Sequence, residues 1–492
     1  MTRDNCWKKY TDEQLRELEA LAVDYRKYLD NGKTERECVK ATIELAKEAG
    51  YRDLQEIVEK GESLQAGDLV YATCMDKAIA LFCIGREPMD KGMRILGAHI
   101  DSPRLDVKQN PLYEDSDLVL LDTHYYGGVK KYQWVTTPLA LHGVVAKKDG
   151  SCVEINIGEA EEDPIFCVTD LLIHLSQDQL QKKGGVVVEG EDLDLLIGSR
   201  PMREEAEEET AAAALAGELE GEDLEELAKL DGAGKKEEKK TGAKELVLSI
   251  LKEKYGIEEE DFLSAELEIV PAGKARDCGL DRSMIAAYGQ DDRVCAFTSL
   301  AALLEAEVGE KTYCCLLVDK EEIGSVGATG MQSRFFENTV AEVMNAAGCY
   351  SELALRRCLS RSKMLSSDVS AAYDPLYAGA FEKKNAAFFG RGLVFNKFTG
   401  SRGKSGSNDA NAEYIAWIRR VMDEAGVGYQ TAELGRVDLG GGGTIAYISA
   451  LYGMEVIDSG VALLSMHAPV EVASKADIYE AKKGYGAFLA AK

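Results

Sequence analysis

The pattern of apolar residues changes twice along this chain of 492 residues, near positions 105 and 285. Before the first change, residues 11–30 and 34–49 have the apolar spacing of helices, and each segment begins at a threonine of capping-box type. Two strands are predicted next, at 79–84 and 94–98. The first part of the chain therefore predicts helices that pack on a sheet.

The middle of the chain has a different pattern. Short β-type runs occur at 118–121, 139–145, 152–157 and 186–188, with glycine and charged turns between them. After residue 285, helical and strand patterns alternate again, at 294–307, 312–318 and 333–347. We predict an α/β fold in which helices flank a central mixed sheet, interrupted by a β-rich module.

The charge balance restricts the partners of this chain. It has 58 basic and 86 acidic residues, a formal net charge of -28, and no stretch rich in lysine and arginine. Phosphate backbones and anionic membranes would be repelled, so we expect neither nucleic acid nor membrane as a partner. Part of the acidic excess lies in the Ala/Glu-rich stretch 203–241, which predicts a solvated and flexible insertion. A metal buffer or an interaction arm is the alternative for that stretch.

The compartment is expected to be the cytoplasm. No apolar run reaches the roughly 18 residues of a membrane helix, and the first fifteen residues lack the apolar core of a signal peptide. The twelve cysteines have no CxxC spacing, which argues against a disulfide framework and a thiolate zinc site.

Histidines and acids follow several of the predicted strands. His99 comes directly after the strand 94–98, and Asp101, two residues later, faces the same side of an extended chain. Asp291 precedes a helix, the pair Glu321–Glu322 follows the strand 312–318, and two further candidates complete the set, Asp368 and His467. Taken alone, each of these residues is more typical of a solvated loop than of a functional site.

Together, these residues point to a metal centre. His99, Asp291, Glu322, Asp368 and His467 are the donors needed to hold two divalent cations, with one bridging aspartate. The spare Glu321 is then suited to accept a proton from water that the cations activate.

Six motifs carry a resemblance to a known family: AHIDSPRLDVK (98–108), YYGGVKKYQW (125–134), GQDDR (289–293), DKEEIGS (319–325), SSDVSAAYDP (366–375) and SMHAP (465–469). The chain resembles the aspartyl aminopeptidase and vacuolar aminopeptidase I family of dinuclear zinc enzymes. The resemblance runs from the N-terminal helices to the C-terminus, except for 203–241.

The resemblance implies roles for individual residues. His99, Asp291 and Asp368 would hold one metal, while Asp291, Glu322 and His467 would hold the other. Asp291 is preferred to Asp292 as the bridge, although the register could differ by one. Glu321 would be the general base, and Asp101 would orient His99. The metals would be zinc, with cobalt or manganese as alternatives.

The resemblance also implies an architecture. Residues 1–105 and 276–492 would form the catalytic domain, and 106–275 an inserted β-rich dimerisation domain. Short peptides would be the substrates, and self-association into a homododecamer would enclose the sites. His174 matches a histidine that reaches a neighbouring subunit's site, although it could be a polar residue on a strand or helix face.

Substrate preference is the finest expectation. Lys397 resembles a substrate-pocket lysine, which predicts acidic N-terminal residues, although it could lie on a basic surface loop. The run Asp438–Thr444, including Gly442, could bring backbone donors to the substrate, or form a tight turn before a helix at Ile445. This chain departs from animal enzymes of the family at YYGGVKKYQW and at the acidic insertion.

Two other classes compete with this prediction. One is a broad or neutral (leucine-type) tetrahedral aminopeptidase of the same clan. The other is a metal-free scaffold that has lost activity. Donors at all five metal positions argue against the scaffold.

Overall fold

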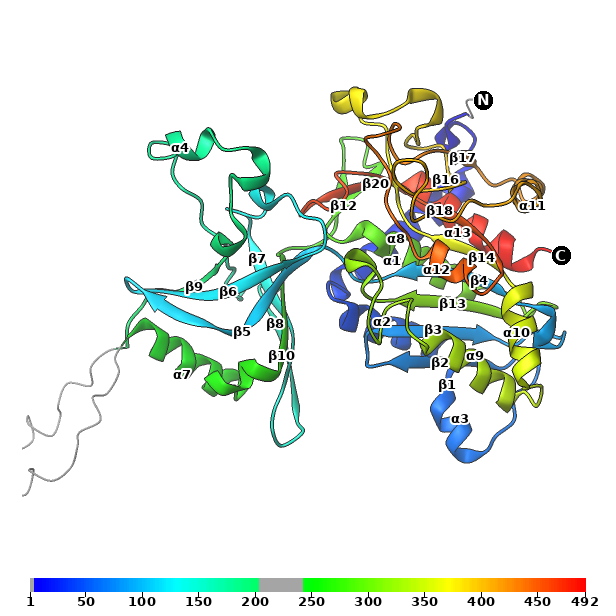
Figure 1. Ribbon diagram of the computed structural model, residues 1–492, viewed down its shortest axis with the longest axis horizontal. Helices are drawn as coiled ribbons and strands as arrows, with labels where there is room; N and C mark the ends of the chain where they lie inside the picture. Colours follow the sequence, from blue (N-terminus) through cyan, green and yellow to red (C-terminus); the bar gives the residue numbers. More distant parts are fainter. Residues whose placement is uncertain (1–3, 203–241) are drawn as a thin grey trace, which may run out of the picture.

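Two lobes make up the protein (Figure 1). The computed structural model describes residues 4–202 and 242–492, so the predicted acidic insertion at 203–241 lies outside the described residues. The larger lobe holds both ends of the chain, and the smaller lobe is built from a central part of the sequence (Figure 1). In the described ranges, no helix combines the length and the apolar character that crossing a membrane requires.

A nine-stranded mixed sheet forms the centre of the larger lobe. In spatial order its strands are β1 (Arg52–Asp53), β2 (Leu69–Cys74), β3 (Ala78–Cys83), β13 (Tyr313–Val318), β4 (Arg94–His99), β14 (Lys363–Ser367), β18 (Glu455–Gly460), β16 (Leu393–Asn396) and β17 (Tyr429–Thr431). The four strands β13, β4, β14 and β18 run parallel, and every residue of β3, β4 and β13 is buried. Because parallel strands end at the same edge, the residues after β13, β4 and β14 meet there.

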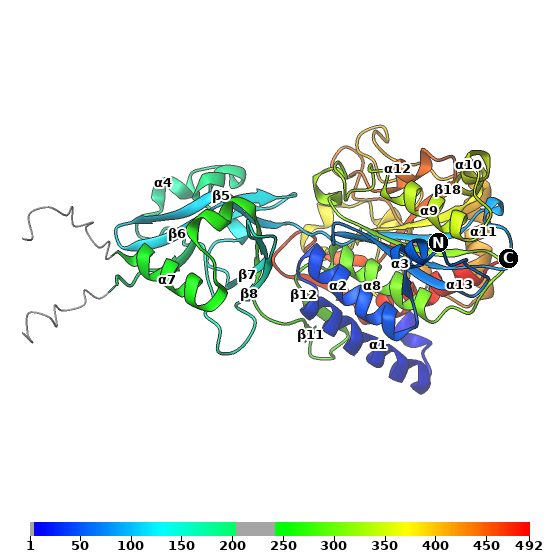
Figure 2. The same ribbon diagram turned by 90° about the horizontal axis from the view of Figure 1, so that it is seen from below.

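Helices cover both faces of this sheet (Figure 2). One face carries α1 (Asp12–Asn31), α2 (Glu35–Glu48), α8 (Gln290–Leu304), α11 (Ala412–Glu424) and α13 (Lys475–Ala490). The other carries α3 (Leu54–Lys60), α9 (Phe335–Ala346), α10 (Glu352–Arg361) and α12 (Ala446–Ala450). The predicted capping boxes at Thr11 and Thr34 are present at the starts of α1 and α2.

The smaller lobe is a six-stranded antiparallel sheet with its own core around the buried Trp134. Its spatial order is β8 (Cys152–Ile157), β7 (Leu139–Ala146), β10 (Ala265–Pro271), β5 (Arg104–Asp115), β6 (Leu118–Tyr126) and β9 (Leu195–Gly198). The helix α7 (Ala243–Tyr255) packs on β5, β6 and β9, and the short α4 (Gln177–Leu180) lies in the connection from β8 to β9.

One predicted strand is wrong. Residues 186–188 join no sheet, and Val186 ends a 3-10 turn, η4 (Gly184–Val186), with half of its surface exposed. The two preceding glycines favour a turn, and the valine run lacks a neighbouring strand to pair with.

A third, five-stranded sheet contains β11 (Arg276–Cys278), β12 (Met284–Ala287), β20 (Glu471–Ser474), β19 (Ala462–Leu464) and β15 (Ser370–Ala371). This sheet belongs to the larger lobe, and its first strand, β11, comes directly after β10 in the sequence. The predicted mixed α/β class is confirmed. The domain limits at 105/106 and 275/276 stay a prediction, although the chain enters the smaller lobe at β5 and leaves it after β10.

Candidate metal centre

The five predicted metal ligands come together at the carboxyl edge of the central sheet. His99 is the last residue of β4, Glu322 lies in the 3-10 turn η7 (Glu321–Ile323) just after β13, and Asp368 follows β14. Asp291 lies in the first turn of α8, after β12, and His467 lies between β19 and β20. The central sheet and the third sheet thus each supply part of the site.

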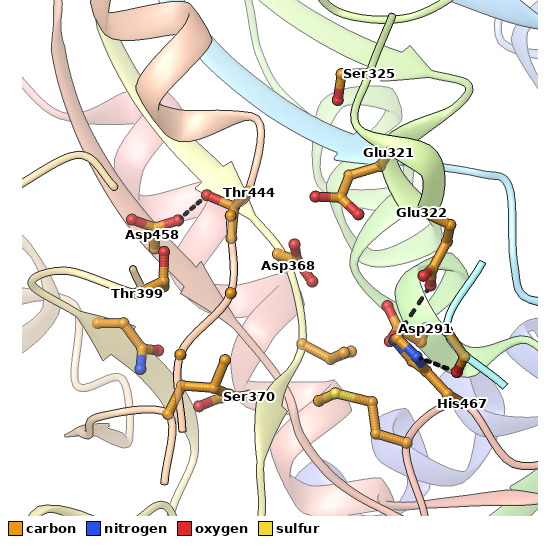
Figure 3. A pocket seen from close by; sticks show the side chains of 18 of the residues that line it. Asp291, Glu321, Glu322, Ser325, Asp368, Ser370, Thr399, Thr444, Asp458 and His467 are labelled. Carbon is orange, nitrogen blue, oxygen red and sulfur yellow. Dashed lines mark hydrogen bonds and ion pairs between the residues drawn. The ribbon is translucent and has the colours of Figure 1, made fainter. Parts of the chain in front are cut away.

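Asp291 lies between the two imidazole rings. Its Oδ1 is 3.3 Å from His99 Nε2, and its Oδ2 is 3.2 Å from His467 Nε2. The same ring nitrogen of each histidine also faces a second carboxylate: Glu322 Oε1 is 3.4 Å from His467 Nε2 (Figure 3), and Asp368 Oδ1 is 4.0 Å from His99 Nε2. Each oxygen of Asp291 therefore faces a different histidine.

The chemistry of these donors fits bound cations. Asp291 Oδ1 and Glu322 Oε1 are buried and accept no hydrogen bond from the residues described. Burial raises the pKa of Glu322, and the charge of Asp291 raises it further. Buried carboxylates without donors are costly unless a cation compensates them, so the residues present suit divalent metal ions.

The register at the aspartate pair is also informative. Asp292 is fully buried, and one of its oxygens lies within 4.8 Å of ligand atoms of His99 and Asp368. An oxygen of Asp291 lies within the same distance of ligand atoms of His99 and Glu322. Because Asp291 alone of the two has a close contact to both His99 and His467, it has the position that a bridging ligand needs.

Asp101 contacts both His99 and the turn that carries Glu321 and Glu322. This fully buried carboxylate accepts hydrogen bonds from the backbone N–H groups of Glu321 and Glu322, both at 3.1 Å. Its Oδ1 is also 3.3 Å from His99 Nδ1, whose other near acceptor is the Asp101 carbonyl at 3.0 Å. Burial alone would raise the pKa of Asp101, but His99 and the Tyr126 hydroxyl hold it below its usual range. Asp101 thus links His99 to the turn that carries the two glutamates.

Two supporting residues were missed from the sequence. Glu471, on β20, accepts the His467 N–H at 2.7 Å and the Asp291 N–H at 3.1 Å, and so fixes the backbone of two candidate ligands. Tyr126, at the end of β6, donates its hydroxyl to Asp101 Oδ2 at 2.9 Å. Glu471 resembles any strand acid in the sequence. Tyr126 lies in the motif 125–134, but that motif alone does not indicate a contact with Asp101.

A cavity of about 490 Å³ opens beside these ligands. Polar side chains lie on its far wall (Figure 3): Ser370, Thr399, Thr444 and Asp458. Asn396 also lines the cavity. Thr444 Oγ1 donates to Asp458 Oδ1 at 2.5 Å, and burial raises the pKa of Asp458 to about 7. The cavity is therefore large enough for an amino-acid side chain and carries negative or neutral polar groups.

Glu321 lies at the edge of this cavity, between the ligands and the open space (Figure 3). Burial raises the pKa of Glu321 to about 7, and divalent cations bound nearby would lower it. A carboxylate in this position can exchange protons with a molecule in the cavity near neutral pH.

The predicted substrate residues are divided between the cavity and the surface. Gly442 and Thr444 line the cavity, although the Gly442 N–H already donates to the Thr399 carbonyl at 3.0 Å. Lys397 does not line it: the side chain is 53% exposed, and Nζ is 3.6 Å from Asp409 Oδ1. Asp438 is exposed on the same glycine-rich loop, and His174 is exposed in the smaller lobe.

Comparison with known proteins gives a consistent result. The family model described as aminopeptidase I zinc metalloprotease (M18) matches residues 28–489. A probable M18 family aminopeptidase 1 of Clostridium acetobutylicum is 58% identical over 485 residues, which cover 99% of this chain and 97% of the relative.

Solved structures are similar over the same length. Aminopeptidase I of C. acetobutylicum has 55% identity and a TM-score of 0.85, and an M18 aminopeptidase of Thermotoga maritima has 41% identity and a TM-score of 0.87. Each similarity covers 99% of both chains. From the family match, the long relatives and the arrangement of ligands, we conclude that this chain belongs to the M18 family of zinc metallo-aminopeptidases.

Proposed function

We propose that this enzyme removes the N-terminal residue of short peptides with two divalent metal ions. The observation that carries the proposal is the position of Asp291, whose two oxygens each face a different histidine at 3.3 and 3.2 Å. A carboxylate that presents both oxygens in this way is suited to bridge two cations.

In this proposal, His99, Asp291 and Asp368 hold one ion, and Asp291, Glu322 and His467 hold the other. Nitrogen and carboxylate donors suit zinc, and cobalt or manganese would also be accepted. Bound there, the ions would supply Lewis-acid chemistry, which polarises the scissile carbonyl and lowers the pKa of the attacking water.

Glu321 is proposed as the general base and acid. It accepts a proton from the water that attacks the scissile carbonyl, and it passes that proton to the nitrogen of the departing peptide. Its place beside the cavity and its backbone link to Asp101 support this role, because a proton shuttle must be held within reach of both oxygen and nitrogen.

The free α-amine of the substrate has a natural place in the same site. Asp368, Glu321 and Glu322 line one wall of the cavity, and among its described lining residues there is no lysine or arginine. With Asp368 and Glu322 compensated by the two cations, Glu321 is the carboxylate of this wall that is left to attract an ammonium group. This charge favours peptides with a free N-terminus.

The preference among N-terminal side chains follows from the far wall. An acidic preference needs Lys397 in the cavity, but its ammonium is beside Asp409 on the surface, whereas Asp458 lines the cavity. At the far wall, a substrate carboxylate would lie near Asp458, and no lysine or arginine is among the described lining residues to pair with it, which is unfavourable. We therefore favour the neutral preference over the acidic one.

A panel of substrates tests this function. We expect a leucyl substrate to be cleaved with kcat/KM about 10-fold or more above that of aspartyl and glutamyl substrates. The N-acetylated leucyl substrate, which lacks the free amine, should not be cleaved. A preference for aspartyl substrates that the Lys397→Met variant abolishes would instead place Lys397 in the cavity and restore the acidic preference.

Self-association is proposed from the surface of the smaller lobe. Leu171, Leu172, Ile173 and Leu175 are between 46% and 67% exposed, and they surround His174 in one loop. Exposed apolar residues gathered in this way favour a protein contact. The solved mApe1 of S. cerevisiae, which is 18% identical, is described as a dodecamer, and we propose the same assembly for this chain.

In such an assembly, His174 would enter the active site of a neighbouring subunit. We then expect the variants His174→Ala and Glu321→Gln each to be nearly inactive alone. Co-expressed in equal amounts, they should recover about one quarter of wild-type activity, because one site in four combines an intact base with an intact neighbouring histidine. Activity assays on the purified mixture measure the recovery. Full activity of His174→Ala alone, or no recovery in the mixture, would contradict the shared site.

A further inference from the structure

A short segment of the smaller lobe lies against the metal ligands of the larger lobe. Tyr126, Gly127 and Gly128 connect β6 to the 3-10 turn η3 (Lys131–Gln133), and we call these three residues the strap. Gly128 lines the cavity together with Asp291, Glu322 and His467. The strap is thus the place where the β-rich lobe contacts the site.

The first contact of the strap is the Tyr126 hydroxyl. It donates to Asp101 Oδ2, the same oxygen that accepts the Glu322 N–H. The ring is 8% exposed, and the Arg104 guanidinium carbon lies 3.9 Å from its centroid. Arg104 is itself held by buried Glu35 and Glu268, at 3.4 and 3.1 Å. Arg104 therefore packs against the ring of Tyr126, while the tyrosine hydroxyl donates to Asp101.

The second contact is the Gly128 carbonyl, which is 2.9 Å from His467 Nδ1. A carbonyl only accepts, so this contact requires the proton of a neutral His467 to be on Nδ1. The lone pair is then on Nε2, the nitrogen that faces Asp291 and Glu322. The strap thus selects the tautomer that can bind a metal ion.

The space around the strap explains why positions 127 and 128 are glycines. A Cβ at Gly127 would lie 3.3 Å from Glu322 Cβ, and the backbone there has a φ of +75°. A Cβ at Gly128 would lie 3.2 Å from His467 Nδ1. Larger residues would push against one ligand or the other, so the close approach of the strap depends on glycine.

We propose that the strap is a positioning element for the metal ion of Glu322 and His467, and for the turn that carries Glu321. The β-rich lobe then contributes directly to catalysis within its own chain, besides any part in assembly. This inference rests on the ligand and base roles proposed above. It goes beyond them because the three strap residues are neither proposed metal ligands nor the proposed base.

The variant Tyr126→Phe tests the hydroxyl, with Tyr125→Phe as the matched control. Tyr125 is the neighbouring residue, and its ring is 41% exposed. We expect Tyr126→Phe to lower kcat about 10- to 100-fold with KM within a factor of about 3, and to release zinc at lower chelator concentration, as loss of an outer hydrogen bond does in metal sites. Tyr125→Phe should match the wild type in both measurements.

The variant Gly128→Ala tests the carbonyl and the close approach. Its control is Gly185→Ala in the same lobe, where an added Cβ meets nothing within 4 Å. We expect Gly128→Ala to lose one of two zinc ions to a chelator that leaves Gly185→Ala and the wild type with both. Metal analysis after dialysis reads this directly, without an activity assay.

Thermal unfolding separates positioning from simple support of the fold. If the strap only stabilised the fold, Tyr126→Phe and Gly128→Ala would lower the melting temperature but leave kcat and zinc retention equal to those of their controls, and the inference would be overturned. If the wild type itself bound no zinc, the proposed ligands would be wrong and the strap's role would fail with them. If the wild type bound two ions and the strap variants matched their controls, the positioning role of the strap would be rejected, but the proposed ligands would stand.

Discussion

Replacing Glu321 with glutamine is expected to lower kcat by about 1,000-fold while both metal ions stay bound. The amide has nearly the same shape as the carboxylate, but it cannot take a proton from water near neutral pH. The backbone N–H of residue 321 donates to Asp101 in either case, so the turn η7 should keep its position. Steady-state kinetics and metal analysis on the same preparation give both values.

The neighbouring variant Glu322→Gln is the control for this experiment. Glu322 Oε1 lies 3.4 Å from His467 Nε2 and is a buried oxygen without a donor. The change should therefore weaken the binding of one metal ion, and activity should fall because that ion is lost. The two variants would thus lose activity for different reasons: Glu321→Gln would keep both metal ions, and Glu322→Gln would lose one. Near-normal turnover in Glu321→Gln would remove this residue from the base role.

Much of the fold could be predicted because its signals are local. The capping boxes at Thr11 and Thr34 each lie within four residues of sequence, and the strands β4 and β13 are largely apolar runs. The same runs located His99 and Glu322, because His99 ends β4 and Glu322 lies in the turn after β13. Val186 was predicted wrongly because a β-branched run forms a strand only where another strand can pair with it, and none does here among the described residues.

The supporting residues of the site could not be predicted in the same way. The partners of Asp101 are Tyr126 and the turn after β13, separated from it by 25 and 220 residues. Glu471 joins Asp291 across 180 residues. No local pattern encodes such contacts, because they arise only when the third sheet and the smaller lobe close on the central sheet. Lys397 illustrates the reverse case: a motif can suggest a pocket lysine, but the motif does not reveal that Asp409 competes for its charge.

The proposed bridging position of Asp291 predicts an unequal result for two aspartate variants. We expect the wild type to retain two zinc ions per chain after dialysis, Asp368→Asn to retain one, and Asp291→Asn to retain neither. The reason is geometric: Asp368 is near His99 alone, whereas Asp291 is near both His99 and His467. Asparagine keeps the size of each side chain, and circular dichroism would verify that both variants are folded.

The difference between these two variants is more informative than the loss of activity, which both should show. If the ions were held independently, each aspartate would affect a single ion, and Asp291→Asn would retain one ion as Asp368→Asn does. If Asp292 were the bridge, Asp292→Asn would lose both ions and Asp291→Asn would not. Only the loss of both ions at Asp291, with one ion left at Asp368, requires a shared carboxylate between His99 and His467. The metal counts therefore test the two-ion mechanism itself, separately from the base role of Glu321 and from the choice of substrate.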